Sequence, residues 1–310
     1  MEHYVTLFNG LFLPQGLALH MSMERHVRDY VLWILCVDDE AYDVLMRLAL
    51  PNVRLLRLSE LETEELLAVK PTRTIGEYCW TLTPFAPRFV FESDATVDRV
   101  TYLDADLWFR KHPEPIFDEF DRAEKHVLIT DHAYSPEYDD SATSGRFCVQ
   151  FMTFTRGGEI VRKWWEERCI EWCFYRFEDG KFGDQKYLDD WPERFSSLVH
   201  VLQDKERALA PWNAERFPYA HAVFYHFHSV RINGPRKMWI GEYHIPTPCL
   251  TFIYMPYKVD LGRALENLNS VGFKEREQTP RVNTIKWLYR KFKRVKRAIH
   301  IVFSVTEMKI

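Results

Sequence analysis

The sequence predicts an α/β protein with a central, mostly parallel sheet and helices on both of its faces. Over the first hundred residues, apolar segments with the length of buried strands alternate with longer amphipathic segments, which is the pattern of repeated strand–helix units. Residues 30–37 are apolar without interruption, as expected for a parallel strand that is covered on both faces. With 310 residues, 46% of them hydrophobic, the chain suffices for one large domain or two smaller ones.

The first half of the chain is predicted to be a nucleotide-binding α/β layer. Its expected strands are residues 4–8, 30–37, 53–58 and 100–103, and its expected helices are 16–30, 40–50, 60–69 and about 77–92. No G-x-G-x-x-G motif follows the first strand and no Walker A sequence is present. Dinucleotide-binding and P-loop interpretations are therefore disfavoured.

Beyond residue 106 the predicted elements become shorter. Strands are expected at residues 127–130, 151–155, 199–202 and 222–227. An amphipathic helix is expected at 159–173, with its tryptophans in the core rather than on a sugar-binding face.

Residues 281–300 differ from the rest of the chain. Eight Lys or Arg residues alternate there with apolar and aromatic ones, a pattern typical of helices that lie on an anionic membrane surface. A solvated surface helix or a partner-binding helix would show the same pattern. We expect a membrane-surface segment.

Composition narrows the remaining possibilities. The net charge of −4 gives no argument for a nucleic-acid partner. The six cysteines contain no C-x-x-C pair, which favours free, buried thiols in a cytosolic protein. The first residues are unlike a signal peptide, and no apolar run approaches the length of a membrane span. A cytoplasmic protein, peripheral at the inner face of the membrane, is expected.

The strongest chemical signal is the sequence Tyr-Leu-Asp-Ala-Asp at residues 102–106. Asp104 and Asp106 follow a buried strand, where α/β proteins place ligands. Residues two apart in a strand point the same way, so the two carboxylates can share one hard divalent cation that in turn holds a diphosphate. A surface turn with two solvated acids is the alternative.

Other polar stretches follow in order. Asp184 and Gln185 come after a glycine turn, where Asp184 is also a plausible helix N-cap. Trp212 and Asn213 lie in a loop. His226 and His228 end a strand at a spacing that places both on one face, beside the candidate metal site.

Together these stretches resemble GT-A glycosyltransferases, in particular the retaining family 8 enzymes and their bacterial surface-polysaccharide relatives. The resemblance runs from the first strand to about residue 257. It implies the GT-A, nucleotide-diphospho-sugar transferase fold, with a Rossmann-like, mostly parallel sheet. It divides a catalytic domain, residues 1–260, into a nucleotide-binding half (1–106) and an acceptor and catalytic half (107–260), followed by a basic amphipathic extension (261–310).

The resemblance also implies roles for residues. Asp104, Asp106 and His226 would hold Mn²⁺ or Mg²⁺ against the donor diphosphate, and Asp184 and Gln185 would lie near the anomeric carbon. Contacts to the nucleotide donor are implied for a larger set: Asn9, Asp38, Tyr78, Thr81, Trp212, Asn213, His228 and Arg231, with Thr83 beside the donor and Lys237 as the alternative basic residue on the diphosphate.

Two departures from the family pattern affect specificity. Residues 147–150 (Phe-Cys-Val-Gln) replace a stretch in which relatives usually carry an Asn and a Gly, and Ser229 stands where a Gly is common. Asp131 and His132 begin either a loop on the acceptor side or an ordinary surface loop.

The expected function is metal-dependent transfer of a sugar from a nucleotide-diphosphate donor, with a UDP-sugar expected, to a bacterial surface polysaccharide or lipid-linked glycan with retention of configuration. Two alternatives stay open: an inverting transferase with Asp184 as general base, and a non-catalytic sugar-nucleotide or glycan-binding subunit. The partners expected are the nucleotide sugar, a glycan or glycolipid acceptor and, through residues 281–300, an anionic membrane surface, with no nucleic acid. The sugar, the linkage and the oligomeric state are left open.

Overall fold

The computed structural model describes residues 1–232 and 237–278. Its first half consists of β1 (Glu2–Phe8), α1 (Leu13–His26), β2 (Tyr30–Cys36), α2 (Asp39–Leu48), β3 (Val53–Arg57), α3 (Glu64–Val69), α4 (Ile75–Leu82), α5 (Phe85–Ser93) and β4 (Arg99–Leu103). Strands and helices alternate here as predicted.

The second half has shorter elements. In order they are β5 (Leu107–Phe109), α6 (Glu114–Ala123), β6 (Val127–Asp131), α7 (Ser141–Ser144), β7 (Phe147–Thr155), α8 (Glu159–Glu171), α9 (Trp191–Arg194), β8 (Val199–Val201), β9 (Ala208–Leu209), β10 (Phe224–His226), β11 (Arg231–Ile232), β12 (Met238–Trp239), α10 (Thr247–Cys249) and α11 (Met255–Ser270).

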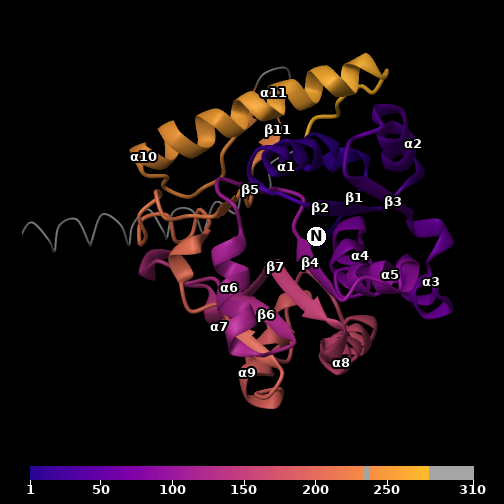
Figure 1. Cartoon of the computed structure of the whole chain (residues 1–310), viewed down its shortest axis with the longest axis vertical. Coiled ribbons are helices and arrows are strands. Elements are labelled where there is room, and N and C mark those ends of the chain that lie inside the picture. Colours follow the sequence, from indigo (N-terminus) through magenta and orange to yellow (C-terminus); the bar gives the residue numbers. More distant parts are fainter. Residues whose placement is uncertain (233–236, 279–310) are drawn as a thin grey trace, which may run out of the picture.

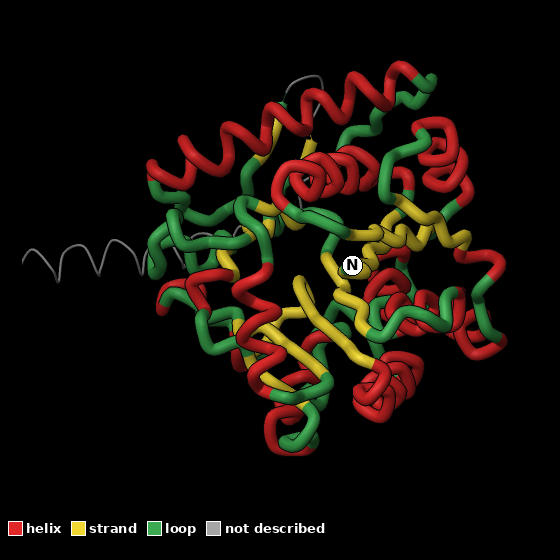
Figure 2. The backbone as a smooth tube through the Cα atoms, viewed as in Figure 1, coloured by secondary structure: helices red, strands yellow, loops and turns green. Residues whose placement is uncertain are grey.

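The main sheet of the described chain has seven strands in the order β3-β2-β1-β4-β7-β6-β8. β1 pairs in parallel with β2 and β4, and β2 with β3, whereas β7 runs antiparallel to its neighbours β4 and β6. A smaller sheet, β5-β10-β9, lies beside it. Figures 1 and 2 show the main sheet at the centre with helices on both sides. The predicted fold class, a mostly parallel sheet flanked by helices, is confirmed.

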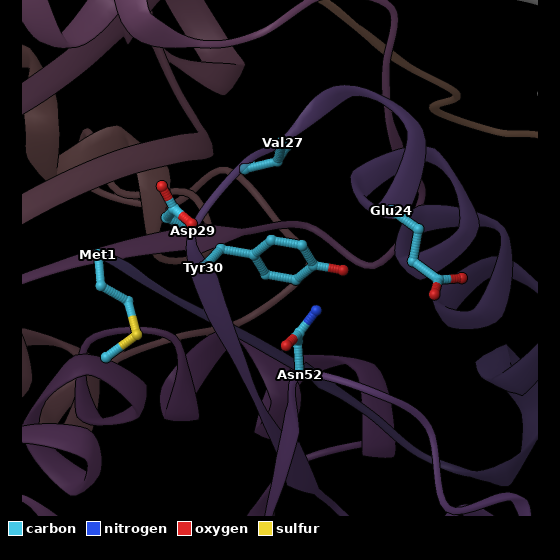
Figure 3. A pocket seen from close by; sticks show the side chains of 6 residues that line it. All are labelled: Met1, Glu24, Val27, Asp29, Tyr30 and Asn52. Carbon is cyan, nitrogen blue, oxygen red and sulfur yellow. The ribbon is translucent and has the colours of Figure 1, made fainter.

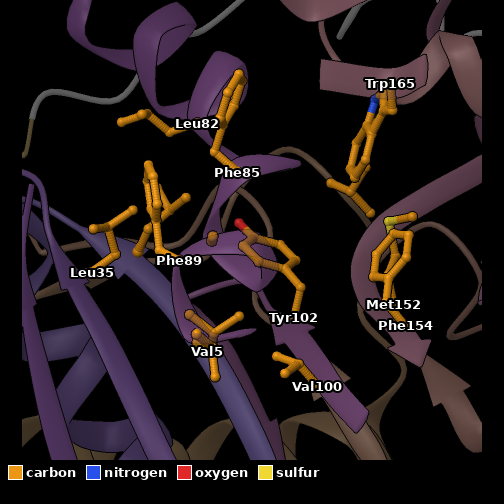
Figure 4. Close-up of a cluster of buried hydrophobic side chains, with 14 of the residues drawn as sticks. Val5, Leu35, Leu82, Phe85, Phe89, Val100, Tyr102, Met152, Phe154 and Trp165 are labelled. Carbon is orange, nitrogen blue, oxygen red and sulfur yellow. The ribbon is translucent and has the colours of Figure 1, made fainter. Parts of the chain in front are cut away.

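The main sheet separates two hydrophobic cores. Along β2, Val31, Trp33 and Leu35 face one core while Leu32 and Ile34 face the other, because successive side chains of a strand point to opposite faces. The first core is closed by α4, α5 and α8, and Figure 4 shows their side chains against those of β1, β4 and β7. The second core is closed by α1, α2, α6 and α11.

Local sequence explains where the helices begin and end. Thr74 and Glu77 form a reciprocal capping box at the start of α4, which satisfies two backbone donors of the first turn. The single helix predicted for residues 77–92 is in fact two, α4 and α5, because Pro84 follows α4 and begins α5 as its N-cap. Proline lacks the N–H that a continuous helix needs.

Other predicted bounds also shift. The helix predicted from residue 60 begins at Glu64, after the N-cap Thr63, whose side chain accepts from Leu66 N–H. The strand predicted at 151–155 begins earlier, at Phe147. The chain from Phe147 to Gln150 is therefore a buried part of β7, the strand that pairs with β4.

The last described helix, α11, lies across α1 (Figure 1). It continues through residue 260, where a domain boundary was predicted, and Leu261, Ala264 and Leu268 are buried in the same cores as the rest of the chain. Within the described residues, no helix combines the length and apolar character needed to cross a bilayer. The predicted membrane-surface segment, residues 281–300, lies outside the described residues.

Candidate metal and nucleotide-sugar site

The candidate site is assembled where two strands of different sheets meet. Asp104 directly follows β4, and Asp106 directly precedes β5. Because β5 pairs antiparallel with β10, Leu107 lies opposite His226. The N–H of Phe227 donates to the Asp106 carbonyl at 2.9 Å. This pairing brings His226, distant in sequence, beside the two aspartates.

Asp104, Asp106 and His226 form a compact donor set, which we call the metal trio. One ligand atom from each lies within 4.8 Å of the other two. Nε2 of His226 is 3.1 Å from an Asp106 carboxylate oxygen and 3.6 Å from one of Asp104. Two carboxylates and an imidazole suit Mn²⁺ and Mg²⁺. No other such group of three is found within the part of the chain that the structure describes.

Gln150 of β7 hydrogen bonds to two members of the metal trio, His226 and Asp104. It was not among the site residues predicted from the sequence. Its side-chain oxygen is 2.8 Å from Nδ1 of His226, and its backbone carbonyl accepts from the Asp104 N–H at 3.1 Å. An amide oxygen only accepts, so Nδ1 donates and Nε2 faces the carboxylates. The one available signal was that residues 147–150 depart from the family pattern.

The charges of the metal trio are strongly coupled. Burial opposes a charge on His226, yet Asp106 and Asp104 outweigh it and raise the His226 pKa well above its usual value. Burial also opposes ionisation of Asp106, but His226 lowers the Asp106 pKa. Burial raises the pKa of Asp104. The pocket between the carboxylates therefore favours a positive charge, which is the requirement of a cation site.

Asp184 supplies a further buried carboxyl group. It is 3% exposed, and its Oδ2 has no hydrogen-bond partner among the described residues. Its carbonyl accepts from the indole N–H of Trp165 at 2.8 Å. Burial and the nearby charge of Asp104 raise the Asp184 pKa to about 8, while a hydrogen bond with Thr83 opposes the shift. Asp184 is therefore neutral at pH 7 when no cation offsets Asp104.

The glycine before Asp184 is required by the turn. Gly183 has φ of +53° and a Cβ there would lie 3.3 Å from the Trp80 ring. The predicted N-cap role of Asp184 is not observed, because its side chain makes no cap hydrogen bond. Gln185 is half-buried and donates to the Ser144 carbonyl at 2.7 Å, which ties this turn to the end of α7.

Two residues predicted to contact the nucleotide follow neighbouring parallel strands. Asn9 follows β1 and Asp38 follows β2, at the same edge of the sheet as Asp104. Asp38 already accepts from the N–H of Ala41, as the N-cap of α2, and from that of Gly10. Asp38 thus fixes the loop after β1. The Asn9 side chain makes no such cap bond.

Several other residues predicted to contact the nucleotide are buried and form hydrogen bonds within the protein. The Thr81 side chain is completely buried and donates to Glu77 of its own helix, and the buried Tyr78 hydroxyl donates to Glu62. Asn213 is also completely buried. In this structure, Thr81 and Asn213 therefore have no surface for a nucleotide.

The loop around Trp212 packs against His226 of the metal trio. Asn213 accepts from Ala210 N–H and donates to the His132 and Ala208 carbonyls. The Trp212 indole also donates to His132, and its ring lies edge-on against that of His226, 5.4 Å between centroids. The loop positions His226 rather than exposing an amide.

His228 and Arg231 follow His226 closely in the sequence. His228 is exposed and its ring is 5.8 Å from that of His226. The positive charge of Arg231 contributes to the lowered pKa of Asp106, so Arg231 lies within electrostatic reach of the metal trio. The alternative basic residue, Lys237, is exposed.

The loop that begins at Asp131 is built into the fold. Asp131 pairs with Lys205 at 2.8 Å and with Arg146 at 3.2 Å. His132 is 3% exposed and stacks on Tyr134 at 4.6 Å. Neither residue is simply a surface-loop residue.

A cavity of about 480 Å³ lies at the other edge of the main sheet. Met1, Asp29, Tyr30 and Asn52 line it, at the amino ends of β1, β2 and β3 (Figure 3). The metal trio lies at the carboxyl end of β4. This cavity is therefore separate from the candidate site, in agreement with the rule that ligands of open α/β sheets bind at the carboxyl ends of strands.

The sheet order and the placement of the metal trio define a GT-A glycosyltransferase fold. Solved structures with this fold are similar to the chain. Galactosyltransferase LgtC, solved in complex with donor and acceptor sugar analogues, matches with a TM-score of 0.51 at 14% identity, over 88% of this chain and 98% of that one. The glycosyltransferase GlyE of Streptococcus pneumoniae TIGR4 matches with a TM-score of 0.51 at 15% identity, over 90% and 65%.

The bifunctional glycosyltransferase WbbM also matches, with a TM-score of 0.51 at 14% identity over 86% of this chain and 49% of that one. At these identities the likenesses establish the fold. The chain belongs to the family of YfnD and YfnF of Bacillus subtilis (strain 168), both described as uncharacterized. It is 30% identical to YfnD over 86% of this chain and 91% of YfnD, and 30% identical to YfnF over 86% and 94%. No protein-family model matches the chain.

Proposed function

We propose that the protein is a metal-dependent glycosyltransferase that takes a sugar from a nucleoside diphosphate donor. The metal trio at the carboxyl end of β4 is the observation that carries this proposal. Asn9 follows β1, which pairs with β4, and Asp38 follows β2, the next strand of the sheet. Arg231 lies within electrostatic reach of Asp106. A nucleotide bound along this edge of the main sheet would have its diphosphate beside the metal trio. Among the described residues, no other group of three such ligands is found.

The residues present fit Mn²⁺ or Mg²⁺. Gln150 holds the His226 imidazole with Nε2 toward the carboxylates, the orientation that a ligating histidine needs. A bound divalent cation stabilises the charge that develops on a departing nucleoside diphosphate. The protein's own part is to hold Asp104, Asp106 and His226 in place and to provide the cationic Arg231 nearby.

Asp184 is proposed to contact the donor sugar. Its unpartnered, buried Oδ2 can bond a sugar hydroxyl, and as a carboxylate it would stabilise positive charge that develops at the anomeric carbon. A cation in the metal trio would offset the charge of Asp104, which is one cause of the raised Asp184 pKa, and would thereby favour the carboxylate form. We propose retention of configuration, in keeping with the resemblance to retaining enzymes, with an inverting reaction that uses Asp184 as general base as the alternative. The anomeric configuration of the product, determined by NMR, separates the two mechanisms.

We further propose that the donor is a UDP-sugar and that the acceptor is a bacterial surface polysaccharide or a lipid-linked glycan. A lipid-linked acceptor accords with the basic, aromatic composition of residues 281–300. Sedimentation with vesicles tests this. The full chain should bind phosphatidylglycerol vesicles and not phosphatidylcholine ones, and a variant with Lys291, Lys293 and Arg294 changed to Glu should lose that binding. Equal binding by this variant would contradict the membrane role.

Hydrolysis and transfer assays with a panel of nucleotide sugars test the proposed function. Asp104→Asn with Asp106→Asn should lower Mn²⁺-dependent turnover by at least about a hundredfold, because two ligands of the cation are lost. Asp98→Asn is the matched control, since Asp98 has a 94% exposed side chain. Unchanged turnover in the double variant would refute the proposal. Nucleotide binding without any turnover in the wild type would favour the non-catalytic alternative.

A further inference from the structure

The chain that follows α11 crosses the loop after β1. Phe273 is 5% exposed and packs into the second core. The guanidinium of Arg276 pairs with Glu40 in the first turn of α2. A Cβ on Gly10 would lie 2.8 Å from a guanidinium nitrogen of Arg276, so this side chain of the segment 273–278 lies directly against the backbone of the loop.

Gln278 is the point at which this segment joins the site. It is 3% exposed, and all four hydrogen-bonding positions of its side-chain amide are filled. Its oxygen accepts from Gln15 Nε2 at 2.7 Å and from the Ile232 N–H at 3.1 Å. Its nitrogen donates to the Leu11 carbonyl at 2.7 Å and to Gln15 Oε1 at 3.2 Å. A surface glutamine has no need of such an arrangement.

The two segments that Gln278 connects are those that carry predicted donor contacts. Leu11 lies two residues after Asn9, and Ile232 is the neighbour of Arg231. The Gln278 N–H also donates to the Ile232 carbonyl at 2.8 Å. The Arg231 guanidinium lies over the ring of Phe12, 5.5 Å from its centroid, so the same two segments touch a second time.

We propose that Gln278 is a positioning residue for donor binding, which fixes the Asn9 loop relative to Arg231. This inference rests on the proposed function. A diphosphate held between two loops binds more tightly when the loops are already at the right separation, because less order has to be created on binding. Side-chain amides that bond the backbone of both loops supply that constraint.

Gln15 provides a matched control. Gln15→Met removes the hydrogen bonds between the Gln15 and Gln278 side-chain amides. It leaves the bonds from Gln278 to Leu11 and Ile232 in place. Gln278→Met keeps the side-chain volume and removes the bridge. A purely structural role would make both variants less stable and equal in donor binding. A positioning role weakens donor binding only in Gln278→Met.

The measurement is calorimetric binding of UDP, with GDP, CDP and ADP in parallel, to the full chain at saturating Mn²⁺. We expect the Kd of the preferred nucleotide to rise by at least about tenfold in Gln278→Met and to stay within about twofold in Gln15→Met. Affinity for Mn²⁺ alone should be unchanged in both, because Gln278 makes no contact with the metal trio. Gln278→Asn, whose amide is too short to reach both loops, replaces Gln278→Met if that variant does not fold.

The outcomes distinguish this inference from the proposed function. Wild-type affinity in Gln278→Met and in Gln278→Asn would overturn the positioning role alone, as would an equal loss in Gln15→Met. Failure of the wild type to bind any of the four nucleotides would overturn both.

Discussion

The side-chain oxygen of Gln150 accepts a hydrogen bond from Nδ1 of His226 at 2.8 Å, and the backbone carbonyl of the same Gln150 accepts from Asp104. One residue of β7 therefore orients two members of the metal trio. Through this relationship the main sheet and the smaller sheet define a single site.

Gln150→Ala is expected to weaken Mn²⁺ binding by about tenfold or more, because loss of the partner that orients a ligating histidine typically costs that much affinity. Isothermal titration of the free protein measures the effect. Gln150→Glu keeps an oxygen for Nδ1–H and should retain the affinity. A Gln150→Ala protein that binds Mn²⁺ like the wild type would show that His226 is oriented by other contacts, such as that with Trp212.

Trp165→Phe should lower the free energy of unfolding by about 1–3 kcal/mol. Trp165 is completely buried, and the substitution keeps most of its packing while the Asp184 carbonyl loses its indole donor. Urea denaturation followed by circular dichroism gives the value. Trp164→Phe, on the neighbouring and partly exposed tryptophan, is the control, and an equal effect of both substitutions would contradict the role of this hydrogen bond.

Asn213→Ala should destabilise the protein by roughly 2–4 kcal/mol, since it leaves the Ala210 N–H and two carbonyls without their partner in a buried loop. Its effect on nucleotide affinity should be small at temperatures at which the variant is folded. Thermal melting and UDP titration together test this. A large loss of UDP affinity with unchanged stability would instead support the direct nucleotide contact predicted from the sequence.

Asp184→Asn should change the pH dependence of stability in the presence of EDTA. Burial raises the folded-state pKa of Asp184 to about 8 from 3.8, so the folded state holds this proton more tightly than the unfolded state does. The stabilisation from the neutral carboxyl is complete below about pH 4 and is lost as the pH rises toward 8. The amide of asparagine does not titrate.

Melting temperatures of the two proteins should therefore agree near pH 4 and diverge with rising pH, with Asp184→Asn the more stable by several degrees at pH 8. Parallel curves between pH 4 and pH 8 would mean that Asp184 is ionised in the folded protein at neutral pH.

The sequence was sufficient to predict the fold class because the parallel strands are continuous apolar runs such as β2. It was also sufficient to select Asp104, Asp106 and His226, which the structure brings together. The small sheet was only partly predicted. β5 and β9 span three residues and two residues, too few for any periodicity, so the strand pairing that delivers His226 to Asp106 was not derivable.

Other misses have specific physical causes. The helix predicted for residues 77–92 is divided at Pro84. The missing N–H of proline could have indicated this break. α6 was not predicted although Ile116, Phe117 and Phe120 form its buried face. The nucleotide contacts of Thr81 and Asn213 stay predictions, and the sequence did not indicate that both side chains hydrogen bond to backbone groups. Gln150 and Gln278 act through tertiary contacts that no local pattern records.

The account depends most directly on cation binding by the metal trio. Electron paramagnetic resonance of free Mn²⁺, titrated with the full chain in the presence and absence of UDP, measures that binding. We predict one Mn²⁺ per chain, bound more tightly with UDP, and loss of that binding in Asp106→Asn and His226→Ala but not in Asp98→Asn. A wild type that takes up no Mn²⁺ with UDP present, or an Asp106→Asn protein that binds it equally well, would contradict the account.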